Sequence, residues 1–148
     1  MTDTRGTGLM TRSFDSYSTH KGPIPMKKRG AMISGVEGKS VAYALWNLED
    51  RGPLFIGPNE KVYGGMIIGE NTKGQDLTVN PLKGKQLTNI RAAGKDDAVD
   101  LTPPIKMDLD KYLAYINDDE LVEVTPTSIR LRKVHLNPHE RKRAQRDN

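Results

Sequence analysis

The apolar residues of this chain fall into short runs that are separated by glycine, proline and polar turn formers. Such runs occur around residues 31–33, 41–43, 54–56, 61–63, 66–68 and 76–80. Short apolar runs bounded by turn formers are typical of strands, because a helix needs a longer periodic pattern. The first half of the chain therefore predicts about six short strands.

The first two of these runs predict a β-hairpin. Residues 31–33 and 41–43 flank Glu37 and Gly38, and a glycine can adopt the positive φ angle that a tight turn requires. The second half of the chain predicts another hairpin, from residues 120–124 and 129–134. Apolar and charged residues alternate in both segments, which is typical of a half-buried strand. We expect the side chains of Leu121, Ile129 and Leu131 to face inward. Those of Arg130 and Arg132 should face outward.

Three segments carry helix signals. Residues 44–50 place Leu45 and Leu48 three positions apart before the stop at Arg51-Gly52-Pro53. Asp108 is placed to cap a second helix, in which apolar residues recur at spacings of three and four. The tetrapeptide Asn137-Pro138-His139-Glu140 has the capping pattern of a third, largely exposed helix.

These elements predict an α+β fold with a mainly antiparallel β sheet or small barrel, two or three peripheral helices and a long basic loop. Residues 1–22 read differently, with at most a short strand around Phe14 and Tyr17, and Gly22, Pro23 and Pro25 then mark a linker. We therefore expect residues 1–22 to be the truncated end of a preceding domain and residues 23–148 to form one domain.

Composition narrows the possible functions. The chain has 148 residues, of which 28% are charged and none is cysteine. A chain without cysteine has no disulfide, no thiol nucleophile and no cysteine-ligated zinc, and a cytoplasmic setting suits it best. No stretch approaches the roughly 20 apolar residues of a membrane span, so we expect no membrane partner. We expect a monomer.

Positive charge is concentrated at the two ends of the chain, and residues 1–48 carry seven basic and three acidic side chains. Residues 129–148 carry seven basic and two acidic side chains, whereas residues 101–128 carry two and six. A segment from about residue 81 to 102 loses its strand signals and becomes rich in lysine, glycine and polar residues, and long loops of this kind tend to be functional or disordered. The candidate RNA-binding residues are Lys83, Lys85, Gln86, Asn89, Arg91 and Lys95, with Arg141, Lys142 and Arg143 as a secondary patch.

The composition of this loop favours one kind of RNA recognition. No aromatic residue occurs between Asn71 and Lys111, so the loop offers no platform for stacking single-stranded bases. The cationic side chains on a glycine-containing backbone suit the phosphate contour of folded RNA. On composition alone, a loop that is merely solvated remains equally open.

Three other patterns carry little chemistry. Gly38-Lys39-Ser40 resembles the end of a phosphate loop, but the required glycine five residues before Gly38 is replaced by Ile33, which favours a plain hairpin turn. His135 and His139 lack a third metal ligand at suitable spacing. The acidic run at residues 118–120 is interpreted as a solvated turn, since nothing nearby would shift a carboxylate pKa. We therefore expect no catalytic, cofactor-binding or metal-binding residue.

Several longer strings resemble a known family. "TDTRGTGLM", "YALWNLEDRGPLFI", "VYGGMIIGEN", "DLTVN", "KGKQLTNIRAAGKDDA" and "DDELVEVTPTSIRLRKVHL" together resemble the C-terminal portion of the BipA/TypA family of translational GTPases. The resemblance implies that residues 1–22 end an elongation factor G-like domain V and that residues 23–148 form the family-specific C-terminal domain. The family holds GTP and Mg in another domain, whose motifs are absent from this chain, so no enzyme activity is expected here.

The resemblance also implies partners. It implies docking on the ribosome, with the loop at residues 80–97 reaching toward large-subunit rRNA and the tRNA acceptor end. The alternative is a protein-interaction module that contacts a ribosomal protein or its own GTPase domain. In that case the acidic region at residues 108–123 would be the working face.

Overall fold

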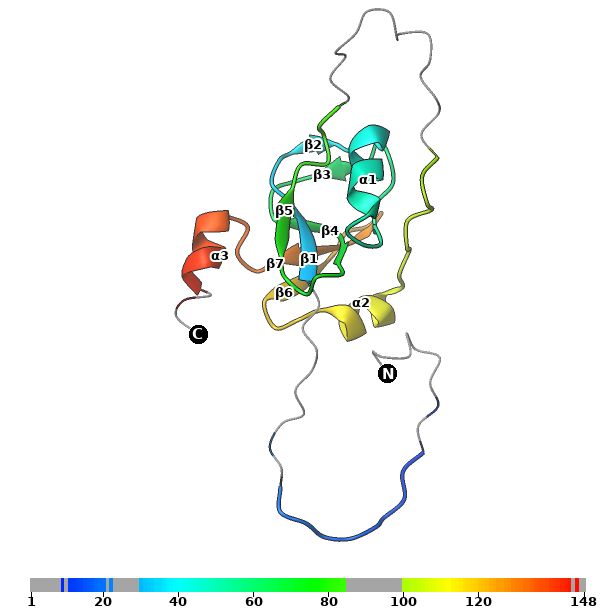
Figure 1. Cartoon of the computed structure of the whole chain (residues 1–148), viewed down its shortest axis with the longest axis vertical. Helices are drawn as coiled ribbons and strands as arrows, with labels where there is room; N and C mark the ends of the chain where they lie inside the picture. Colours follow the sequence, from blue (N-terminus) through cyan, green and yellow to red (C-terminus); the bar gives the residue numbers. More distant parts are fainter. Residues whose placement is uncertain are drawn as a thin grey trace, which may run out of the picture.

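A curled five-stranded sheet organises the part of the chain that the computed structural model describes, namely residues 9, 11–20, 22, 30–84, 100–144 and 146 (Figure 1). In chain order the elements are β1 (Gly30–Ser34), β2 (Gly38–Lys39), α1 (Ala42–Glu49), β3 (Lys61–Val62), β4 (Met66–Asn71), β5 (Leu77–Val79), α2 (Leu109–Tyr115), β6 (Glu120–Val124), β7 (Ile129–Lys133) and α3 (Pro138–Ala144).

The order of strands in the sheet is β5-β1-β4-β7-β6, and β2 and β3 form a separate two-stranded ribbon. Strand β1 pairs antiparallel with β4 and parallel with β5. The pairs β4–β7 and β6–β7 are antiparallel. The predicted α+β class with a mainly antiparallel sheet is confirmed, and the sheet is not closed into a barrel.

Both faces of the central strands are buried. On β1, Met32 belongs to one apolar cluster, together with α1, while Ala31 and Ile33 belong to another, together with α2. The same division occurs on β4, where Ile68 faces the α1 side and Ile67 the α2 side. Burial on both faces explains why these strands read as continuous apolar runs rather than as alternating patterns.

The predicted hairpin between residues 31–33 and 41–43 is wrong. Strand β1 pairs with β4 and β5, and residues 42–49 form α1. The buried Ser40 fixes this turn away from β1, because its hydroxyl group donates to the carbonyl of Gly57 over 2.7 Å. Gly38 does have the positive φ that was predicted, +149°, but it lies in β2 and a Cβ there would be only 2.3 Å from Leu82.

The predicted strand around Phe14 and Tyr17 is also wrong. Residues 11–20 have no regular secondary structure, and both aromatic side chains are largely exposed, with ring centroids 5.4 Å apart. A strand needs a partner for its backbone groups, and these residues have none among the described residues. The division of the chain at residue 22 stays a prediction.

The predicted second hairpin is confirmed as β6 and β7. Leu131 is buried, as expected, but Leu121 is 39% exposed, so its predicted inward orientation is wrong. Side chains alternate along a strand, and Glu120 occupies the buried face next to it. Sequence alternation alone could not show that a carboxylate, rather than the leucine beside it, points inward.

Glu120 is buried because Lys133 is buried opposite it. The ammonium group of Lys133, which is 3% exposed, lies 2.7 Å from Asp76, 2.8 Å from Asp119 and 2.9 Å from Glu120. Burial by itself lowers the pKa of Lys133, but hydrogen bonds to these three carboxylates outweigh it and raise the pKa above its ordinary value. The acidic turn is therefore not merely solvated, which corrects the prediction for Asp119 and Glu120.

Replacement of Lys133 by methionine tests this cluster. Lys133→Met keeps most of the side-chain volume but leaves Glu120 buried and without its cation, so we expect a loss of about 3–5 kcal/mol in the free energy of unfolding, measured by urea denaturation at neutral pH.

The matched control is Lys111→Met. Lys111 pairs with Asp108 over 3.5 Å at the exposed surface of α2, where an ion pair contributes less than about 1 kcal/mol. Equal stability losses in the two variants would contradict a structural role for the buried cluster.

Candidate nucleic-acid interface

The segment that follows β5 is firmly attached to the rest of the fold. The amide of Val41 donates to the carbonyl of Pro81 over 3.0 Å, and the amide of Leu82 donates to the side-chain oxygen of Asn80 over 2.9 Å. Pro81 is buried, whereas Lys83 is exposed. The structure thus presents Lys83 to solvent from an anchored backbone, at the start of the predicted loop.

Most of that loop lies outside the described residues. Among the predicted RNA-binding residues, this applies to Lys85, Gln86, Asn89, Arg91 and Lys95. Their role stays a prediction.

The secondary basic patch lies on α3. The side-chain oxygen of Asn137 accepts a hydrogen bond from the amide of His139 over 2.9 Å, which confirms the predicted cap. Arg141 donates from one guanidinium nitrogen to the carbonyl oxygens of His135 and Leu136, over 3.0 and 2.6 Å. Partial burial lowers the pKa of Arg141 from its ordinary value. Arg141 therefore anchors the helix to the preceding turn.

The other two basic residues of α3, Lys142 and Arg143, are exposed. In Figure 1, α3 lies at one side of the sheet, while the segment that follows β5 leaves from the top. The structure therefore does not bring Lys83 together with the α3 residues. They occupy different parts of the surface.

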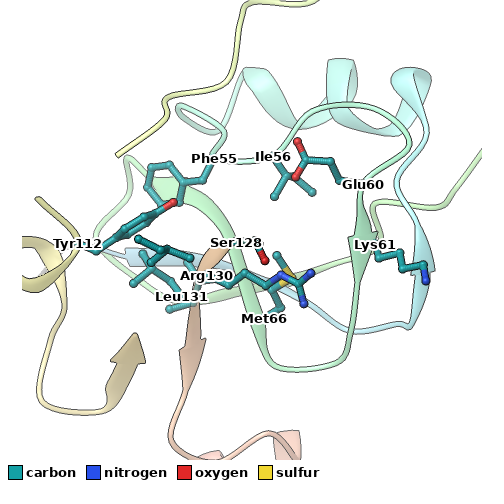
Figure 2. A pocket seen from close by; sticks show the side chains of 11 residues that line it. Phe55, Ile56, Glu60, Lys61, Met66, Tyr112, Ser128, Arg130 and Leu131 are labelled. Atoms are coloured by element: carbon teal, nitrogen blue, oxygen red, sulfur yellow. The ribbon is translucent and has the colours of Figure 1, made fainter. Parts of the chain in front are cut away.

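A hollow of about 240 Å³ opens between α2, β4 and β7. Figure 2 shows the rings of Phe55 and Tyr112 on one side of it and Arg130 and Lys61 on the other. Burial, and then the negative charge of Glu60, raise the pKa of the Tyr112 hydroxyl group.

Glu60 and Ser128 also line this hollow. Glu60 accepts a hydrogen bond from the amide of Gly57 over 2.9 Å, and the hydroxyl of Ser128 lies 2.9 Å from that of Thr125. Both side chains thus stabilise turns, and the structure shows no hydrogen bond from the Ser128 hydroxyl group to a base among the described residues. The hollow lies over the paired strands β4 and β7, beside α2.

The Gly38-Lys39-Ser40 motif does not form a phosphate loop. Gly38 and Lys39 form β2, and the fully buried Ser40 hydroxyl also accepts from the amide of Glu60 over 3.1 Å. A phosphate loop needs this hydroxyl group for Mg²⁺ and successive free amides for phosphate. The residues present therefore do not fit a nucleotide.

The described residues contain neither a metal-ligand cluster nor a membrane-spanning helix. No three His, Asp or Glu side chains gather there in a way that could hold a metal ion. None of the described helices combines the length and apolar character that a bilayer crossing needs.

Sequence reasoning missed a second hollow, a groove of about 400 Å³ between α1 and β5. We call it the α1–β5 groove. Its polar lining includes Tyr43, Asn47, Arg51, Asn80 and Lys83. The lining residues from α1 and those from β5 and the segment after it lie far apart in the sequence, so no local sequence pattern indicates the groove. The signal that could have revealed this wall of the groove was the spacing of Tyr43 and Asn47, which are four residues apart on the helix face that the predicted core residues do not use.

These features define a small α+β domain whose buried charges are structural and whose exposed charges are largely basic near β5 and α3. The chain belongs to the TypA/BipA C-terminal domain family, whose model matches residues 29–138. The resemblance seen in the sequence is thereby confirmed.

Curated relatives match along almost the whole chain. A large ribosomal subunit assembly factor BipA from Salmonella typhimurium is 54% identical over 147 residues, or 99% of this chain. Proteins of the same name from Haemophilus influenzae and Buchnera aphidicola are 53% and 52% identical, each over 99% of this chain. The chain spans 24% of the length of each of these three relatives.

The anchoring role of Arg141 can be tested by hydrogen exchange. Arg141→Ala removes two hydrogen bonds from a charged donor, so the amides of α3 should exchange about tenfold faster. Arg143→Ala is the matched control and should leave these exchange rates unchanged, because Arg143 is exposed. The same exchange rates in both variants would show that Arg141 does not hold the helix.

Proposed function

We propose that this chain is the ribosome-binding C-terminal region of a translational GTPase, and that it contacts large-subunit rRNA and the tRNA acceptor end through its basic loop. The observation that carries the proposal is the match, over 99% of this chain, to relatives named as large ribosomal subunit assembly factors. Family membership supports the ribosome as the partner, and the exposed basic residues support contact with the phosphates of its RNA.

The electrostatics support RNA as the partner. Lys83 is exposed at the end of an anchored backbone, and the loop that it begins carries Lys85, Arg91 and Lys95. Cationic side chains that neutralise phosphates release counterions, which gives affinity without sequence recognition. On α3, Lys142 and Arg143 offer a weaker second contact, because Arg141 is already engaged with backbone carbonyls.

Within the whole protein, GTP hydrolysis belongs to another domain, which would hold GTP and Mg. The present chain would position the factor on the ribosome. Residues 1–22 would complete the preceding domain, and residues 23–148 would form the docking domain in a cytoplasmic, monomeric factor.

Charge neutralisation of the loop tests this function. In a variant with Lys83, Lys85, Arg91 and Lys95 all replaced by glutamine, we expect weaker binding to large ribosomal subunits. Each lost phosphate contact removes roughly 0.7–0.9 from the slope of log affinity against log salt, so four contacts remove about 3. Sedimentation binding at several salt concentrations measures both quantities.

The matched control replaces Arg12, Lys73, Lys106 and Lys111 by glutamine, which removes the same number of arginines and lysines from exposed positions outside the loop. It should retain both the affinity and the salt slope. The proposal fails if the loop variant binds as tightly as the unaltered chain, or if both variants lose affinity equally.

A protein-interaction module is the second candidate function, and one observation favours it. Helix α2 exposes Leu109 and Leu113, at 41% and 55%, in the acidic region at residues 108–123. An apolar helix face with acidic neighbours suits a ribosomal protein or the GTPase domain of the same factor better than RNA. Nuclease protection of large-subunit rRNA separates the two candidates, because docking through α2 leaves no RNA footprint that depends on the loop.

A further inference from the structure

The α1–β5 groove combines features that the predicted loop lacks. It has a volume of about 400 Å³, within the range of roughly 300–1,000 Å³ for small-ligand sites. One wall comes from α1 and the other from β5 and the residues that follow it. The groove therefore lies at the base of the basic loop, on the anchored part of the fold.

The charge of the groove is positive. Arg51 and Lys83 line it, both are exposed, and neither forms an ion pair with a carboxylate of the described residues. Two acidic residues precede Arg51 in the sequence, and neither lines the groove: Asp50 is exposed, and Glu49 accepts a hydrogen bond from the amide of Thr102 over 2.7 Å. Two cations without a carboxylate partner favour an anionic ligand.

The groove also offers an aromatic surface. Tyr43 lines it, and its ring centroid lies 6.3 Å from that of Trp46, which is 49% exposed. Trp46 is not a lining residue, and Tyr43 is half-buried, so only part of the Tyr43 ring is open to the groove. A partly open aromatic ring beside cationic groups suits an unpaired nucleotide, because every base can stack on a ring. The loop itself has no aromatic residue, so α1 supplies what the loop cannot.

Polar groups complete the lining. The side-chain amide of Asn47 donates to the carbonyl of Tyr43 over 2.7 Å, which leaves its oxygen as an acceptor. The side-chain oxygen of Asn80 accepts from the amide of Leu82, which leaves its nitrogen as a donor without a partner among the described residues. One acceptor and one donor, on opposite walls, suit the edge of a base.

We propose that the α1–β5 groove binds one unpaired nucleotide of folded RNA, with the base against Tyr43 and the phosphate between Arg51 and Lys83. This inference rests on the proposed function, since it assumes that the chain docks on RNA. It adds a second mode of recognition, because the loop follows the phosphate contour while the groove selects a nucleotide that has left its stack.

Two RNA hairpins test the proposal with the complete 148-residue chain. They have the same sequence except that one carries a single bulged adenosine. Fluorescence anisotropy of the labelled RNA gives both affinities, and the unaltered chain should bind the bulged hairpin roughly 5- to 100-fold more tightly. The bulged hairpin alone should also shift the backbone amide resonances of Tyr43, Asn47 and Asn80, which is a measurement that needs no variant.

Variants then locate the contact. Tyr43→Leu should abolish the preference for the bulged hairpin, whereas Tyr17→Leu, which alters a tyrosine that is 96% exposed, should retain it. Arg51→Gln should weaken binding of the bulged hairpin more than Arg12→Gln does. The emission of Trp46, the single tryptophan of the chain, reports whether the groove variants keep their fold.

The outcomes separate this inference from the proposed function. Loss of affinity for both hairpins in the four-residue loop variant, with no preference for the bulge in the unaltered chain, would retain RNA docking and overturn the groove site. Equal affinities that Tyr43→Leu does not change, or resonance shifts that avoid α1, would overturn it as well. An unaltered chain that bound neither hairpin nor large subunits would contradict both proposals.

Discussion

The buried ammonium group of Lys133 is the interaction on which this fold depends. Its three carboxylate partners come from two places in the chain: Asp76 lies before β5, and the adjacent Asp119 and Glu120 lie where β6 begins. Strands β5 and β6 are the two edges of the sheet, so the ion cluster joins edges that share no hydrogen bonds. Asp76 also accepts from the amide of Ala31, which ties β1 to the same point. A single cation thereby keeps the sheet curled although it does not close.

Curling has a consequence for packing, because it buries both faces of β1 and β4. There is little room between the layers, as Gly69 shows: a Cβ at that position would lie 2.7 Å from the carbonyl oxygen of Pro53. The peripheral helices and the segment after β5 are attached to this rigid centre. The exposed charges near β5 and on α3 are therefore held by a scaffold whose own charges are already neutralised.

Basic residues in this chain have two separate tasks. Lys133 is engaged with carboxylates in the interior, and Arg141 is engaged with backbone carbonyls beside α3. Lys83 and Arg51 are exposed beside a groove and are available to an anionic partner. A count of positive charges treats these four residues alike. Their burial and their partners distinguish them, and only the exposed ones enter the proposed RNA contacts.

The sequence by itself determined the α+β class, the β6–β7 hairpin, the Asn137 cap and the family, because these depend on local spacing and on residue strings. Tertiary structure decided the pairing of β1, the inward orientation of Glu120 and the α1–β5 groove. The physical reason is that strand partners and buried charges are chosen by side chains far apart in the sequence. The apolar run at residues 31–33 does not indicate that its strand partners are β4 and β5. The acidic run at residues 118–120 does not indicate that Asp119 and Glu120 pair with a buried Lys133.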